Sequence, residues 1–135
     1  MADRQAITDL FADYAWALDA NDFDLLAQVF HEDASFTINI AGADPVGPIE
    51  PGAAIVEFIR GTVQGQDDQR RHVITNMRYE SESDAAAQVT ATLTLIVVAN
   101  GSLSVQSTGV YHVEIVQEGG TWQFRQFSLD LDLPF

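Results

Sequence analysis

The sequence predicts an α+β fold in which three helices cover one face of a curved antiparallel sheet. Three observations lead to this prediction. Apolar residues recur at the helical period in much of the first 63 residues, they alternate at the strand period from about residue 71 onward, and turn motifs separate the later strands. The 135 residues fit a single domain, residues 1–135, which is large enough to enclose a core and a pocket.

The first two helices are predicted from their apolar stripes. Residues 4–18 carry inward-facing side chains three and four positions apart, at Ile7, Leu10, Phe11, Tyr14 and Leu18. A break follows, in which Asn21 or Asp22 can cap a shorter helix that ends near Phe30. His31 comes next in a polar run, and we expect it in a surface turn.

One strand and a third helix come before the main part of the sheet. Residues 35–40 alternate strictly between polar and apolar, which is typical of a half-buried strand. Residues 41–52 contain three of the four prolines together with three glycines, so we expect a loop. Residues 53–63 again place apolar side chains at the helical period.

Four strands complete the chain as an antiparallel meander. They are predicted at about 71–80, 86–99, 103–117 and 121–132, and Asn100-Gly101 is a strong hairpin signal between the second and the third. Because helices and strands are segregated, the helices can cover one face of the sheet. We therefore expect a cavity between the helices and the sheet, open at one end.

Composition excludes several classes of function. The chain has 20 acidic and 6 basic residues and a formal net charge of −14, so neither nucleic acid nor an anionic membrane is an expected partner. The absence of cysteine excludes disulfides and thiolate chemistry and is compatible with a cytoplasmic location. No segment has the length and apolarity of a membrane span, and the three histidines show no metal-ligand spacing. We expect no metal and no cofactor.

Two residues stand out chemically, because a carboxylate that orients an imidazole makes a general base without a metal or cofactor. Asp19 closes the first helix, and His72 opens a strand that reads Arg-His-Val-Ile-Thr-Asn over residues 71–76. Tyr14 lies in the apolar stripe of the same helix as Asp19. The sequence shows these residues but not their contact.

Several segments together resemble the SnoaL-like family of the nuclear-transport-factor-two-like superfamily. They are residues 6–11, Tyr14, Asp19 and residues 23–30, followed by His72 in its strand and by Trp122-Gln123-Phe124 in the closing strand. The resemblance covers nearly the whole chain. It implies a cone-shaped sheet wrapped by three helices, on a scaffold that hosts both enzymes and non-catalytic binders.

Within the family, the Asp–His pair is most similar to the scytalone dehydratase and hexachlorocyclohexane dehydrochlorinase branch. The resemblance implies that His72 is the base, that Asp19 orients it, and that Tyr14 donates a proton to a leaving oxygen or a carbonyl. The substrate would then be a small, mostly apolar and cyclic organic molecule. Candidates for the apolar wall, chosen by segment, are Phe36, Ile38, Phe58, Val73 and Phe127.

Three functions remain open at this point. The first is a cofactor-independent lyase that performs a dehydratase-type elimination. The second is an isomerase or polyketide-type cyclase that uses the same base, and the third is a non-catalytic protein that binds a small ligand. The resemblance also implies a homodimer or higher homo-oligomer, formed through the outer face of the sheet.

Overall fold

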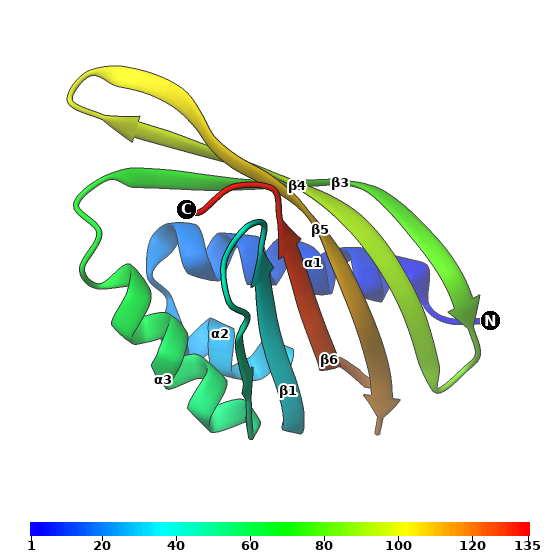
Figure 1. The fold of residues 1–135 in the computed structure, drawn as a ribbon. Coiled ribbons are helices and arrows are strands. Elements are labelled where there is room, and N and C mark those ends of the chain that lie inside the picture. Colours follow the sequence, from blue (N-terminus) through cyan, green and yellow to red (C-terminus); the bar gives the residue numbers. More distant parts are fainter.

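The computed structural model describes residues 1–135 and contains three helices and one six-stranded sheet (Figure 1). The helices are α1 (Arg4–Ala20), α2 (Phe23–Val29) and α3 (Gly52–Val63). The strands are β1 (Phe30–Ile40), β2 (Val46–Ile49), β3 (Gln69–Glu82), β4 (Ala86–Ala99), β5 (Ser102–Glu118) and β6 (Thr121–Leu131). The strands lie in the order β2-β1-β6-β5-β4-β3.

The predicted α+β class is confirmed, and the sheet needs two corrections. Strands β3 to β6 form the expected antiparallel meander, but β1 pairs with β6 in parallel, so the sheet is mixed rather than antiparallel. The predicted loop 41–52 contains the short strand β2, which pairs with β1. Proline can take part here because β2 is the edge strand, where a missing N–H removes no bond from the sheet interior.

Side-chain caps set the ends of the first two helices. The Asp3 carboxylate accepts a hydrogen bond from the Ala6 N–H at 3.0 Å and begins α1. Asn21 adopts a left-handed conformation with φ of 55° at the C-terminal cap, and Asp22 accepts from the Leu25 N–H to begin α2. The chain therefore turns sharply just after Asp19, which keeps this residue in the last turn of α1.

Strand β3 changes face part-way along its length. Residues 70, 72 and 74 are partly buried and their neighbours exposed, but after Asn76 the partly buried positions become Met77 and Tyr79. Asn76 has a positive φ of 56° and lies where the pairing of β3 with β4 shifts register. Such a bulge bends a strand and moves the following side chains to the other face. Simple alternation from His72 onward would instead have placed Asn76 inside and Met77 outside.

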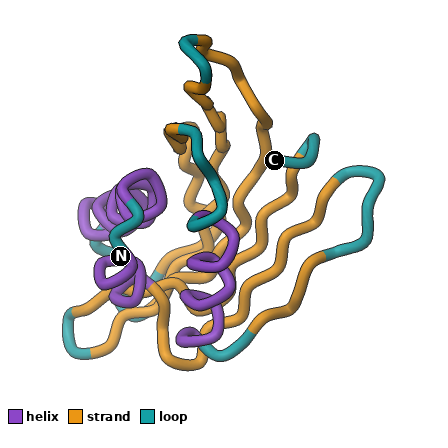
Figure 2. Tube along the Cα trace, turned by 90° about the vertical axis from the view of Figure 1, so that its left-hand side faces the viewer, coloured by secondary structure: helices purple, strands orange, loops and turns teal.

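The core lies between the helices and the concave face of the sheet, and the helices gather on that side in Figure 2. An aromatic cluster occupies its centre. Its rings have centroid distances between 5.0 and 6.3 Å and mostly tilted or edge-to-face geometry. The members are Phe11, Tyr14, Phe30, Phe36, Tyr111, Phe124 and Phe127.

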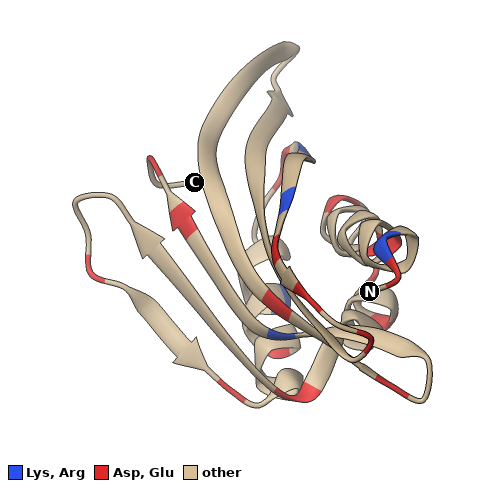
Figure 3. Cartoon of the chain, turned by 90° about the vertical axis from the view of Figure 1, so that its right-hand side faces the viewer, with Lys and Arg blue, Asp and Glu red and all other residues tan.

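Acidic side chains are spread over helices, strands and turns rather than gathered in one patch (Figure 3). None of the three helices has the length and apolar character needed to cross a membrane. No three histidine, aspartate or glutamate side chains come close enough together to form a metal-ligand set.

Candidate functional site

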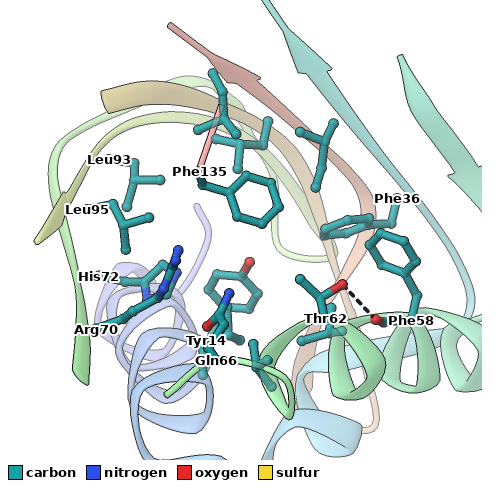
Figure 4. Close-up of a pocket in the computed structure, with 16 residues that line it drawn as sticks. Tyr14, Phe36, Phe58, Thr62, Gln66, Arg70, His72, Leu93, Leu95 and Phe135 are labelled. Carbon is teal, nitrogen blue, oxygen red and sulfur yellow. Dashed lines mark hydrogen bonds between the residues drawn. The ribbon is translucent and has the colours of Figure 1, made fainter. Parts of the chain in front are cut away.

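A mostly apolar cavity lies between α1, α3 and the inner face of the sheet (Figure 4). Its volume is about 70 Å³, and leucine, isoleucine and phenylalanine side chains make up most of its wall. Five polar or charged side chains also reach it, at Tyr14, Thr62, Gln66, Arg70 and His72. A few polar groups converging on an apolar cavity is the usual arrangement of a small-molecule site.

The structure brings the carboxylate of Asp19 to the imidazole of His72. Asp19 Oδ1 lies 2.7 Å from His72 Nδ1, and both side chains are 12% exposed. The same carboxylate accepts the backbone N–H of His72, at 3.1 and 3.2 Å from its two oxygens. Two residues 53 positions apart are therefore joined by both side-chain and backbone contacts.

This contact defines which imidazole nitrogen is free. An ionised carboxylate can only accept hydrogen bonds, so the hydrogen between Asp19 and His72 resides on Nδ1. In the neutral ring Nε2 then carries the lone pair, and no hydrogen bond within the chain occupies it. His72 lines the cavity, and Nε2 is the ring nitrogen left without a partner in the chain.

Local structure explains how the pair meets. Asp19 lies in the last turn of α1, where the chain ends its helical path, and Gln69 of β3 donates from its side chain to the Asp19 carbonyl at 3.2 Å. The beginning of β3 is therefore held against the end of α1. Strand alternation then turns Arg70 and His72 inward and Arg71 and Val73 outward.

Tyr14 lies one and a half turns before Asp19 and lines the same cavity. Its side chain is almost fully buried, and burial, with a smaller contribution from the Asp19 charge, raises the pKa of its hydroxyl well above the usual value. The hydroxyl therefore stays protonated at neutral pH. It makes no hydrogen bond within the chain, so it remains available as a donor to a ligand.

Three of the five predicted wall residues line the cavity, namely Phe36, Ile38 and Phe58. The other two do not. Phe127 is buried one layer deeper, where its ring stacks on Phe36 with centroids 5.0 Å apart. Val73 is 38% exposed on the opposite face of β3, because it alternates with His72.

The prediction for His31 was wrong, because its side chain is buried rather than in a surface turn. Its Nδ1 accepts the backbone N–H of Asp33 at 3.0 Å, and its Nε2 lies 2.9 Å from Glu118. Both ring nitrogens are therefore occupied, and this second carboxylate–histidine contact links β1 to the end of β5. His72 differs in keeping one nitrogen unpaired.

Sequence reasoning missed Arg70, which is the only fully charged side chain that lines the cavity. Its guanidinium is held by Asp68, with Nε 3.1 Å from Oδ1 and Nη2 3.5 Å from Oδ2. The signal was present in the sequence, since a residue two positions before an inward-facing histidine shares its face of the strand.

Phe135 was also missed, and its side chain forms part of the cavity wall. Its ring extends into the space above Tyr14, between the polar side and the phenylalanine side (Figure 4). A cavity of about 150 Å³ is known to hold benzene, so the present 70 Å³ is too small for a cyclic molecule while the Phe135 ring is inside. A cyclic ligand would have to displace this ring.

Comparisons with known proteins agree with one another. A family model described as a SnoaL-like domain matches residues 1–128. No curated protein matches the chain.

Several solved structures are similar. LinA shares 21% sequence identity at a TM-score of 0.78, covering 98% of this chain and 88% of that one. A candidate scytalone dehydratase from Novosphingobium aromaticivorans shares 21% identity at a TM-score of 0.75, covering 96% and 84%. ActVI-ORFA from Streptomyces coelicolor shares 19% identity at a TM-score of 0.79, covering 96% of both chains. At these identities the likeness establishes the fold.

Proposed function

The chain belongs to the SnoaL-like family, and on this premise we propose that it is a cofactor-independent lyase acting on a small, cyclic, mostly apolar organic molecule. One observation carries the proposal. His72 lines an apolar cavity and is held through Nδ1 by a mostly buried carboxylate, while its Nε2 has no hydrogen-bond partner in the chain. This arrangement suits a general base better than it suits a structural histidine, as the fully occupied His31 illustrates.

The proposed reaction begins when His72 Nε2 removes a proton from a substrate carbon. The electrons of that C–H bond form a carbon–carbon double bond as a hydroxyl group leaves from the neighbouring carbon. The departing oxygen takes a proton and becomes water. The imidazolium that forms is stabilised by the Asp19 carboxylate, which stays ionised throughout.

Tyr14 is the proposed proton donor to the leaving oxygen. Its hydroxyl lines the cavity wall and makes no hydrogen bond within the chain, so it can donate to a bound ligand. After the product leaves, His72 loses its proton to solvent and Tyr14 regains one from solvent, which restores both groups. The apolar lining supports the same chemistry, because charges interact more strongly where water is excluded. The candidate scytalone dehydratase among the similar structures, at 21% identity, supports an elimination.

The experiment is to incubate the protein with a set of small cyclic hydroxy compounds and to follow the products by mass spectrometry. We expect loss of water with the wild type and a decrease of roughly 10²–10⁴-fold in the His72→Gln variant. His112→Gln is the matched control, because His112 is half-exposed and pairs with Asp130 away from the cavity. Full activity in His72→Gln would rule out the proposed role.

The same assay separates the two alternatives. Products of unchanged mass would indicate an isomerase or cyclase that uses the same base. Ligand binding without any conversion, detected by chemical-shift changes at residues of the cavity, would indicate a binding protein.

A further inference from the structure

We propose that Arg70 binds a substrate oxygen and that the site is therefore built for an uncharged carbonyl compound. This inference deepens the function proposed above and rests on it. It follows from where Arg70 lies, from how its guanidinium is held, and from the charge balance around the cavity.

Arg70 and His72 are close enough together to act on one substrate, with His72 as the base and Arg70 as the oxygen-binding group. Arg70 and His72 are two residues apart on the inward face of β3, so their Cα atoms are about 6.6 Å apart. Both side chains lie on the same side of the cavity, across from Phe36 and Phe58 (Figure 4). In a ketone the acidic C–H and the carbonyl oxygen are on adjacent carbons, so the groups that receive the proton and the charge must also be neighbours.

Asp68 fixes the guanidinium of Arg70 but leaves some of its N–H donors without a hydrogen-bond partner. Asp68 engages Nε and one hydrogen of Nη2, while no hydrogen bond within the chain occupies Nη1. The Arg70 and Asp68 side chains are only 14% and 17% exposed, which is unusual for charged groups. A fixed guanidinium with unused donors is suited to donate hydrogen bonds to an oxygen without reorganising.

The charges around the cavity favour a neutral carbonyl oxygen over a negatively charged carboxylate oxygen. The charges of Arg70 and Asp68 cancel. With His72 in the neutral form that the proposed base requires, Asp19 leaves the four side chains with about one negative charge before reaction. A carboxylate substrate would enter against that charge. A neutral carbonyl would not, and its oxygen would gain negative charge only once His72 has become positive.

The proton-transfer step balances as follows. The α-proton moves to His72 Nε2, the C–H electron pair forms a carbon–carbon double bond, and the carbonyl π electrons move to the oxygen. The resulting enolate oxygen accepts hydrogen bonds from Arg70. In deuterated water the imidazolium exchanges its hydrogen with solvent, and return of a deuteron to carbon regenerates neutral His72. Exchange of the α-proton with solvent therefore reports this step without any knowledge of the natural substrate.

The test uses 1-indanone in deuterated water, with α-proton exchange followed by NMR. We expect the wild type to accelerate the exchange, His72→Gln to abolish the acceleration, and Arg70→Gln to reduce it by about 10²–10³-fold. Arg71→Gln is the matched control, since it removes the same charge from the adjacent exposed position and should exchange like the wild type. Arg70→Lys keeps the charge without the forked geometry and should retain an intermediate rate if Arg70→Gln does not fold.

A second probe, 4-nitrophenol, reports the oxygen site without turnover, because its ionised form absorbs at longer wavelength. At a pH where the free probe is neutral, the phenol enters uncharged and passes its O–H proton to His72, and Arg70 donates hydrogen bonds to the phenolate oxygen that remains. The bound probe should therefore be ionised in the wild type and Arg71→Gln, and neutral in Arg70→Gln. Exchange that depends on His72 but not on Arg70 would overturn this inference and leave the proposed function standing. Absence of exchange, with ionisation that depends on Arg70, would overturn the proposed function and leave the oxygen site. Ionisation that is the same in Arg70→Gln and the wild type would overturn the oxygen site.

Discussion

Replacing Asp19 by Asn tests how much the site depends on a charged partner for His72. The substitution keeps the size of the side chain and removes its charge. In the wild type, Asp19 Oδ1 lies 2.7 Å from Nδ1, and the carboxylate also accepts the His72 backbone N–H. An amide has one acceptor oxygen, so it cannot serve both donors equally well, and its NH₂ group facing Nδ1 would move the ring hydrogen to Nε2.

The magnitude follows from the geometry. Two unit charges about 4 Å apart interact by about 4 kcal/mol at an effective dielectric constant of 20, and this is the stabilisation that the imidazolium loses. Since about 1.4 kcal/mol corresponds to tenfold in rate, the α-proton exchange of 1-indanone should slow by roughly 10³-fold. The folded state loses a charge-assisted hydrogen bond, so the free energy of unfolding should fall by about 1–2 kcal/mol.

The assay compares exchange rates and urea unfolding for the wild type, Asp19→Asn and a control. Asp13→Asn is the matched control, because Asp13 lies on the same helix with an exposed side chain. It should change neither quantity by more than the error of the measurement. A folded Asp19→Asn variant with a wild-type exchange rate would refute the reasoning.

Four further predictions follow. Tyr14→Phe should slow elimination by about 10²-fold in the product assay, because it removes the proposed proton donor, while leaving the midpoint of urea unfolding nearly unchanged. Tyr111→Phe should raise the free energy of unfolding by about 1 kcal/mol, because the Tyr111 hydroxyl is buried without a hydrogen-bond partner; lower stability would contradict this. Phe135→Ala should tighten binding of 1-indanone several-fold in an NMR titration, because it removes the ring that fills the cavity; weaker binding would show that this ring forms part of the site. The Arg4 guanidinium donates to the Glu82 carboxylate and lowers the pKa of that carboxyl. The contact therefore stabilises the folded state fully above the ordinary pKa of a glutamate, and this stabilisation is lost as the pH falls through the lowered pKa of Glu82. Glu82→Gln should therefore lose less stability than the wild type on acidification, measured by thermal unfolding at several pH values, and an unchanged pH dependence would contradict this account.

Much of the fold could be predicted from local sequence patterns, because each helix and each long strand has its own periodicity of apolar residues. These patterns could not predict which strands pair with one another over long distances in the sequence. Nothing local in residues 46–49 marks them as a strand, since β2 exists only because β1 lies beside it. The parallel pairing of β1 with β6 likewise depends on how the whole chain turns between residues 40 and 121.

The candidate site likewise contains residues whose positions follow from a local sequence pattern and residues whose positions do not. The face occupied by His72 followed from strand alternation, and that rule, applied to its neighbours, also separates Arg70 inside from Val73 outside. The rule fails at Asn76, where a bulge changes the face. Phe135 could not have been predicted to lie in the cavity, because no periodicity connects the last residues to the end of the sheet.

The most direct test of the central claim is ¹⁵N NMR of the histidine side chains at neutral pH, with His72 assigned by comparison with His72→Gln. The account predicts that Nδ1 of His72 carries the hydrogen and that Nε2 is unprotonated and shifts when a ligand enters the cavity. A hydrogen on Nε2, or a tautomer unaffected by Asp19→Asn, would contradict the claim that Asp19 prepares His72 as a base.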